Sequence, residues 1–175
     1  MRKKLLKLKT LILIILIGIG LGIFIRENKT TWSMIKIPFV ESYIKFDDTR
    51  QTKWSKDFEI VEIESSIDKS IQKAYFYKSK SSEPKPLIVS LHTWSGDYSQ
   101  NDDKAEISKQ KELNYIHPDF RGANNTVNAC SSEKALTDID DAITYAIRNS
   151  NVDTTKIYVI GASGGGYATL STFMK

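Results

Sequence analysis

A serine stands among glycines near the end of the sequence, in the segment Gly161-Ala162-Ser163-Gly164-Gly165. This segment matches the pattern Gly-x-Ser-x-Gly, in which a serine hydroxyl attacks carbonyl groups. The backbone turns so sharply at such a serine that side chains two residues before and after it would collide, so glycine is needed at both positions. We therefore interpret Ser163 as a nucleophile, with Gly161 and Gly165 as the glycines that permit the turn.

The flanking residues predict the elements that this turn requires. Residues 156–161 form an apolar run typical of a central strand, and residues 166–170 indicate the start of a helix. A helix that begins there directs the N–H of Gly164 toward an oxyanion formed at the serine. Two other interpretations stay open. A phosphate-binding turn is one, although both glycine-rich phosphate patterns are absent; a tight turn without function is the other.

The residues before the motif predict an α/β domain. Alternating apolar residues at 58–64 and a second run at 71–77 indicate an antiparallel pair of strands. Residues 87–92 are almost continuously apolar, as in a strand buried on both faces, and residues 113–119 are a weaker candidate. Residues 134–148 have the apolar spacing of an amphipathic helix. Strand, helix and strand in this order favour a parallel sheet.

Both ends of that helix carry residues suited to them. Ser131 or Ser132 can cap its first turn, and Asn149 can end it. Asp138, Asp140 and Asp141 lie toward its beginning, where we expect them to act on the helix dipole. The helix also opposes a trypsin-like arrangement, which needs an all-β double barrel.

Four segments in this order resemble the α/β-hydrolases, and within them the prolyl-oligopeptidase-like serine peptidases and esterases: residues 87–97, 117–122, 138–142 and 161–167. The resemblance covers about half of the chain. It implies a partial α/β-hydrolase sheet, in which an antiparallel N-terminal pair leads into parallel strands with helices. It also implies that Ser163 is the nucleophile and that the loop after His92, at Thr93 or Trp94, supplies a second oxyanion donor beside Gly164.

The sequence contains two histidines and one cysteine. His92 ends a strand before the serine, and the resemblance implies a structural role for it, since the hydrolase order is serine, acid, histidine. We interpret His117, together with Arg121, as ordering a loop. Cys130 is expected to be a small buried or loop residue, because no basic residue adjoins it closely in sequence to lower its pKa.

No Asp, Glu or His follows Ser163 in this sequence. The hydrolase order places the acid and the histidine after the serine. We therefore expect an N-terminal portion of a serine hydrolase that cleaves an ester or peptide bond, and near inactivity of residues 1–175 alone. We also expect apolar surface on the last helix, at Thr169, Leu170, Phe173 and Met174, to be left uncovered. The alternative is a non-catalytic remnant or an anchored binding module with the same sheet.

The first 26 residues differ in character from the rest. They contain six basic residues and no acidic one, and Leu11–Ile25 is an uncharged run of 15 residues. As a helix this run spans roughly 22 Å, and its apolar flank and snorkelling cations extend it toward the ~30 Å hydrocarbon core. We expect a transmembrane anchor at 1–26 with the N-terminus in the cytoplasm, a stalk at 27–57, and the hydrolase domain at 58–175 outside. A cleaved signal and secretion are the alternative.

Charge and composition exclude several partners. The whole chain has 25 basic and 21 acidic residues. Without the six cations of the N-terminal segment, 19 basic residues face 21 acidic ones, so we expect no nucleic-acid surface. The partners that remain are the membrane and a peptide or ester substrate. No cofactor or metal is implied, because acyl transfer to serine needs none.

Overall fold

The computed structural model describes residues 53–174. The anchor expected at 1–26 and most of the stalk lie outside the described residues. Residues 53–174 include no helix that is both long enough and apolar enough to span a membrane. The elements in this part of the chain are β1 (Glu59–Glu64), β2 (Ile71–Tyr77), β3 (Lys85–Leu91), α3 (Asp103–Gln110), β4 (Asn114–Pro118), α4 (Glu133–Asn149), β5 (Val152–Gly161) and α5 (Gly164–Met174).

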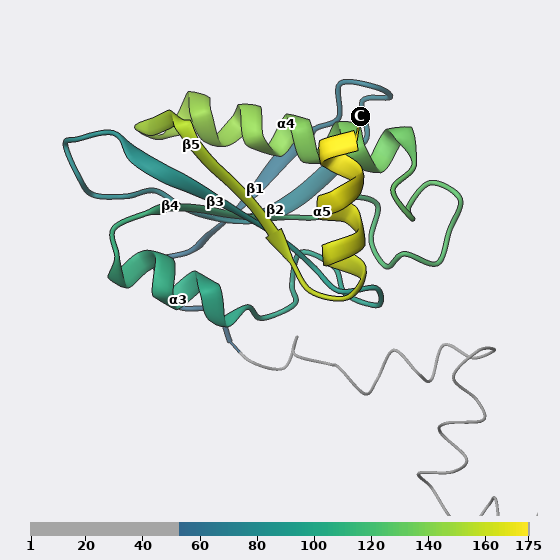
Figure 1. The fold of residues 1–175 in the computed structure, drawn as a ribbon, viewed down its shortest axis with the longest axis horizontal. Coiled ribbons are helices and arrows are strands. Elements are labelled where there is room, and N and C mark those ends of the chain that lie inside the picture. Colours follow the sequence, from purple (N-terminus) through teal and green to yellow (C-terminus); the bar gives the residue numbers. More distant parts are fainter. Residues whose placement is uncertain (1–52, 175) are drawn as a thin grey trace, which may run out of the picture. The chain divides into compact units, whose positions relative to one another are not determined.

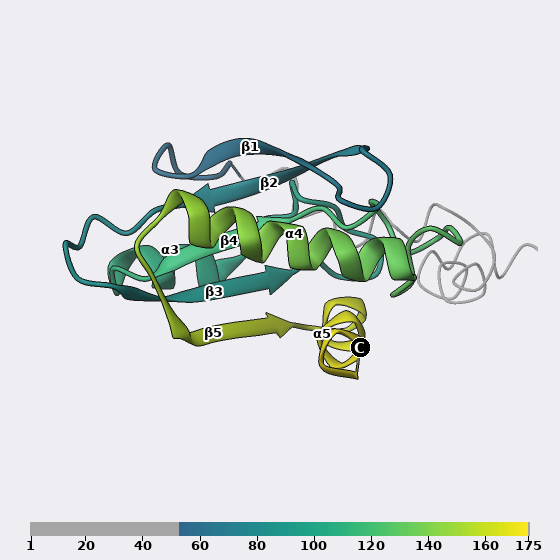
Figure 2. The same ribbon diagram turned by 90° about the horizontal axis from the view of Figure 1, so that it is seen from above.

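The strands form one mixed sheet in the order β1-β2-β4-β3-β5 (Figure 2). β1 pairs antiparallel with β2, and β2 pairs antiparallel with β4. β4, β3 and β5 run parallel to one another. The carboxyl ends of these three strands therefore meet at one edge of the sheet, which is where ligands bind in open α/β sheets.

The helices lie on both faces of this sheet. α4 runs along one face and α3 along the other (Figure 1), and α5 contacts α4, β3 and β5. Alanines at 135, 142 and 146 are fully buried on α4 and let the helix approach the strands closely. They join Leu87, Val89 and Ile116 in the main core cluster. A second cluster on the α3 side consists of Phe58, Tyr77, Ala105 and Tyr115.

Most expected elements are confirmed, with small differences at their ends. The 71–77 strand is found with the expected bounds, and the weaker candidate at 113–119 is β4. Ser132 caps α4, where its Oγ accepts a hydrogen bond from the N–H of Ala135 at 3.2 Å. Asn149 is the last residue of α4 rather than the residue beyond it, because the Ser150 N–H continues the hydrogen bonding to Ala146.

Two features differ from the sequence analysis. α3 was not expected, because its exposed charges leave only Ala105 and Ser108 buried and no apolar stripe marks it. The strand at 156–161 was expected to be central, but within residues 53–174 β5 pairs only with β3 and lies at the edge. Its Tyr158 is 52% exposed. An apolar run predicts that a strand is buried, but it does not show which elements bury it.

Trp54 packs onto the domain, although it lies within residues 27–57, which were expected to form the stalk. Its indole stacks on the Tyr75 ring at 4.2 Å between centroids and lies edge-on to Phe58 at 5.4 Å.

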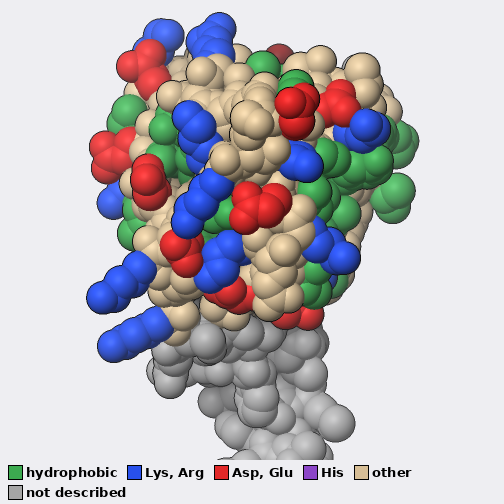
Figure 3. Space-filling view, turned by 90° about the vertical axis from the view of Figure 1, so that its left-hand side faces the viewer, with side chains coloured by type: hydrophobic (Ala, Val, Ile, Leu, Met, Phe, Trp, Pro, Cys, Tyr) green, Lys and Arg blue, Asp and Glu red, His purple; other side chains and the backbone are tan. Residues whose placement is uncertain are grey.

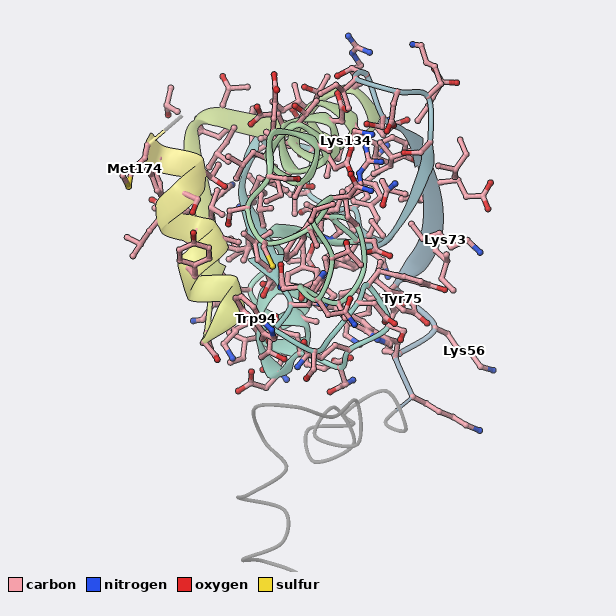
Figure 4. All side chains as sticks on the ribbon, turned by 90° about the vertical axis from the view of Figure 1, so that its right-hand side faces the viewer. Lys56, Lys73, Tyr75, Trp94, Lys134 and Met174 are labelled. Carbon is pink, nitrogen blue, oxygen red and sulfur yellow. The ribbon has the colours of Figure 1, made fainter. Side chains whose placement is uncertain are left out.

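The amino ends and the carboxyl ends of the parallel strands lie at opposite edges of the sheet. Positive and negative side chains are interspersed at the amino-end edge (Figure 3). The carboxyl-end edge of the sheet, where α5 begins, faces the viewer in Figure 4.

Candidate active site

Ser163 lies on the corner between β5 and α5. β5 ends at Gly161 and α5 begins at Gly164, so the serine occupies the turn itself. Its φ of +51° places a residue with a side chain in the left-handed region, which costs roughly 1–2 kcal/mol for any residue with a Cβ. The serine is exposed, and its hydroxyl makes no hydrogen bond within residues 53–174. The corner thus presents a strained, unengaged hydroxyl to solvent.

Close backbone contacts explain the glycines around Ser163. A Cβ added to Gly161 would lie 2.4 Å from the carbonyl carbon of Gly165. A Cβ added to Gly165 would lie 2.2 Å from the carbonyl oxygen of Leu91, on the neighbouring strand. Contacts this short with backbone atoms require the chain to move. Both glycines are therefore needed for space, as the sequence pattern predicts.

Gly164 has a steric role that the pattern does not reveal. A Cβ at this position would lie 2.5 Å from the backbone nitrogen of Trp94. The loop after β3 therefore packs directly against the residue that follows the serine. The Trp94 nitrogen therefore lies against Gly164, and the N–H groups of these two residues donate no hydrogen bond within residues 53–174. Two neighbouring unpaired N–H groups are the arrangement that binds an oxyanion.

The structure distinguishes the two candidate oxyanion donors of that loop, the N–H groups of Thr93 and Trp94. The N–H of Thr93 donates to Oε1 of Gln100 at 2.7 Å, so it is engaged elsewhere. The N–H of Trp94 remains unengaged beside Gly164. The indole of Trp94 is 48% exposed and lies at the foot of α5 (Figure 4). Sequence reasoning left Thr93 and Trp94 as equal candidates, and the geometry favours Trp94.

Both histidines are buried under this edge. His92 is 1% exposed, and its ring stacks on Phe120 at 3.8 Å between centroids. Burial lowers the pKa of His92 to about 4, and burial also lowers the pKa of His117. Neither imidazole makes a described hydrogen bond to Ser163. The structural role expected for His92 agrees with its burial, and neither buried ring is hydrogen-bonded to the exposed Ser163, so the two imidazoles are not placed to act as its base.

The loop after β4 is fixed by a buried ion pair. The Arg121 Nε lies 2.5 Å from Oδ2 of Asp138, and its NH2 group also donates to Ser65 Oγ at 3.0 Å. The same guanidinium contacts Asp68 at 2.9 Å and holds the pKa of that carboxyl well below its usual range. Arg121 thereby orders the loop, as the sequence analysis expected.

The interpretation of the helix acids is corrected for two of the three residues. Asp138 is 2% exposed and binds Arg121 and Ser65 across the sheet, so its role is the buried ion pair and not the helix dipole. Asp141 accepts a hydrogen bond from the N–H of Ser66 at 2.7 Å. Both carboxylates tie α4 to the turn between β1 and β2. Sequence proximity to a helix start does not show which side chains point inward.

Two smaller features complete the site. Cys130 is half-buried in the loop before α4, where its Sγ lies 2.8 Å from the carbonyl oxygen of Asn124, in agreement with the loop role expected for it. Among the described residues, no group of three or more His, Cys, Asp and Glu side chains forms a metal site.

The last helix, α5, exposes most of the apolar side chains that were expected to be uncovered. Leu170, Phe173 and Met174 are 66%, 74% and 86% exposed, whereas Thr169 is half-buried.

Solved structures share this architecture. A thermostable esterase is 20% identical over 67% of this chain and 37% of its own, with a TM-score of 0.53. Acylaminoacyl peptidase from Pyrococcus horikoshii is 23% identical over 69% of this chain and 21% of its own, with a TM-score of 0.58. A thermophilic carboxylesterase from a metagenomic library is 19% identical over 77% and 46%, with a TM-score of 0.56.

These similarities show the fold. The chain has a partial α/β-hydrolase fold, and it spans less than half the length of each of these structures. No family model matches the sequence. No curated protein matches it either. The three solved structures named above are two esterases and a peptidase.

Proposed function

We propose that this chain carries the nucleophile and the oxyanion hole of a serine hydrolase that cleaves an ester or peptide bond. One observation supports this most directly. Ser163 stands exposed at a positive φ, the N–H of the next residue, Gly164, is unpaired within residues 53–174, and the equally unpaired nitrogen of Trp94 packs against Gly164. A serine that serves only as a turn residue needs neither the strain nor the adjacent donors.

In the proposed reaction, Ser163 Oγ attacks the carbonyl carbon of the substrate. The hydroxyl proton passes to a general base, and the carbonyl oxygen becomes an oxyanion that accepts hydrogen bonds from Trp94 and Gly164. Collapse of this intermediate expels the alcohol or amine, which takes the proton from the base. Water then releases the acyl group from Ser163 by the same steps.

The base is a further part of the proposal. His92 and His117 are the two histidines of the sequence, and both are buried without a hydrogen bond to Ser163. We assign the base to a histidine outside residues 1–175, oriented by an Asp or Glu that also lies outside them. Residues 1–26 would anchor the domain on the outer face of a membrane, or would direct its secretion.

A fluorophosphonate probe tests this proposal, because it reacts with activated serines. The natural protein, isolated from the cells that make it, is expected to be labelled at Ser163, and the Ser163→Ala variant is expected to lose that labelling. Residues 1–175 expressed alone should react at least roughly 10³-fold more slowly, because the general base is missing. Ser171→Ala is a matched control, because Ser171 is a half-buried serine of α5 whose Oγ donates to the Tyr167 carbonyl, and it should react like the natural protein.

Two outcomes contradict the proposal. If the natural protein shows no labelling at Ser163, the chain is a remnant or a binding module that keeps only the sheet. If residues 1–175 alone are labelled as fast as the natural protein, the assignment of the base to a residue outside them is wrong. Peptide and ester substrates are then compared by the rate of acyl release.

A further inference from the structure

Gln100 holds the loop that carries the proposed oxyanion donor. Its Oε1 accepts the Thr93 N–H at 2.7 Å and lies 3.2 Å from Thr93 Oγ1, while its Nε2 donates to that same hydroxyl at 3.0 Å. Gln100 is only 7% exposed, so its carboxamide is fixed in the interior. One side chain therefore engages both the backbone N–H and the hydroxyl of Thr93, the residue just before Trp94.

The backbone of the loop brings the two residues together. The N–H of Gly96 donates to the Thr93 carbonyl at 3.0 Å, and the N–H of Gln100 donates to the Asp97 carbonyl at 3.0 Å. These two turns return the chain to Thr93. A Cβ added to Gly96 would lie 2.3 Å from Oε1 of Gln100. The glycine at 96 therefore leaves room for the carboxamide.

The other side of Trp94 is fixed as well. Its carbonyl oxygen accepts the N–H of Asn124 at 2.7 Å, and Asn124 is buried in the loop between β4 and α4. Gln100 thus holds the peptide unit between His92 and Thr93, and Asn124 holds the peptide unit after Trp94. In the peptide unit between these two, the Thr93 carbonyl accepts the Gly96 N–H. The Trp94 N–H makes no hydrogen bond within the described residues, and its nitrogen lies 2.5 Å from the point that a Gly164 Cβ would occupy.

We propose that Gln100 is a positioning residue of the oxyanion hole: by binding Thr93, it turns the Trp94 N–H toward the oxyanion formed at Ser163. This inference rests on the proposed function. A preorganised donor stabilises the charge that develops in the transition state, without reorganisation during the reaction. Loss of the Gln100 contact should therefore lower the turnover rate and leave substrate binding nearly unchanged.

The test compares four variants of the natural protein. Gln100→Met keeps the length of the side chain but removes both hydrogen-bonding groups, and Gly96→Ala displaces the carboxamide by an independent route. Gln100→Glu keeps an acceptor for the Thr93 N–H and is the conservative rescue. Gln110→Met is the matched control, because Gln110 is an exposed residue at the end of α3.

We expect Gln100→Met and Gly96→Ala to lower kcat on an activated ester roughly 10²-fold with KM nearly unchanged, which is the effect of losing one oxyanion donor. Gln100→Glu should recover most of that rate, and Gln110→Met should match the natural protein. Equal kcat in Gln100→Met and the natural protein would overturn the inference, as would a rise in KM at constant kcat.

Amide hydrogen exchange measured by NMR separates this inference from the proposed function. In the natural protein the Thr93 N–H is expected to exchange slowly, and in Gln100→Met it should exchange at least about tenfold faster, with protection restored in Gln100→Glu. If the natural protein is inactive, the proposed function fails and this exchange pattern alone decides on the Gln100 contact. Unchanged Thr93 exchange in Gln100→Met overturns the contact whether or not the protein is active.

Discussion

Two corners at the same edge of the sheet share a strained backbone and use it differently. Arg121 follows β4 with a φ of +81°, and Ser163 follows β5 with a φ of +51°. The Arg121 side chain is fully engaged by Asp138, Asp68 and Ser65, whereas the Ser163 hydroxyl makes no hydrogen bond within residues 53–174. The strained backbone at Arg121 supports an ion pair, whereas the strained backbone at Ser163 leaves the hydroxyl free at the surface, which fits the nucleophile proposed above.

His92 connects the two corners. β3 lies between β4 and β5 in the sheet. The His92 ring stacks on Phe120 at the β4 corner, and a Cβ added to Gly165 at the β5 corner would lie 2.8 Å from the His92 carbonyl oxygen. A change at either corner therefore reaches the end of β3. The predictions that follow test whether the β4 corner serves stability and the β5 corner serves chemistry.

The largest change in stability is expected at the β4 corner. Arg121→Met keeps the aliphatic stem but leaves Asp138 buried without its partner, which should lower the free energy of unfolding by about 3–5 kcal/mol. Lys134→Met is the control, because Lys134 contacts the same Asp68 from an exposed position and should cost less than about 1 kcal/mol. Urea unfolding of the full chain measures both. Equal losses in the two variants would contradict a structural role specific to Arg121.

The next effect depends on pH and acts through His92. Its pKa is about 4 in the folded protein because it is buried, and about 6.5 in the unfolded chain. Above pH 6.5 neither state binds the proton, so His92 leaves stability unchanged. Between pH 6.5 and 4 the unfolded chain gains a proton that the folded protein does not, so the free energy of unfolding falls by about 3 kcal/mol in total.

The pH dependence is measured by urea unfolding at intervals from pH 7.5 to 4. His92→Gln should flatten the part of the curve that His92 contributes, while His117, whose pKa burial also lowers, keeps its own share. An NMR titration that finds His92 protonated in the folded protein at pH 5.5 would contradict the burial argument. It would also reopen His92 as a candidate base.

Glycine substitutions at the two corners distinguish positions where glycine is needed for lack of space from positions where it is needed for its backbone conformation. Gly165→Ala should lower the free energy of unfolding by about 1–3 kcal/mol, because its Cβ meets the Leu91 carbonyl. Gly166→Ala meets its nearest atom at 3.3 Å and should stay within about 1 kcal/mol of the natural protein. At the β4 corner, Gly122 has open space around it but a φ of +68°, so Gly122→Asn should be tolerated better than Gly122→Val. Thermal unfolding ranks these variants.

The smallest expected effect is a gain in stability. Ser163→Gly removes the Cβ from a left-handed residue and should raise the free energy of unfolding by about 1 kcal/mol relative to Ser163→Ala, which keeps it. Both variants lack the nucleophile and should be inactive. Arg121→Gly relieves the same strain but loses the ion pair, so it should destabilise. A Ser163→Gly variant less stable than Ser163→Ala would show that the corner is not strained.

The local elements could be predicted because periodicity and turn chemistry are properties of neighbouring residues. The alternation at 58–64, the run at 87–92 and the spacing at 134–148 each specified an element close to its observed bounds. The helix α3 escaped prediction because it buries small residues and exposes charges, and no apolar stripe marks it. The position of β5 at the edge of the described sheet was not predicted either, because apolar residues do not show which neighbouring element covers them.

The sequence by itself determined the nucleophile candidate, because a glycine two residues on either side of a serine is required wherever the chain turns that sharply. Only the tertiary structure decided that Trp94 and not Thr93 offers a free N–H, since that choice depends on Gln100, seven residues farther along the chain. Only the tertiary structure paired Arg121 with Asp138. Spacing along the chain governs local backbone geometry, whereas hydrogen bonds between distant residues depend on which strands the fold brings side by side.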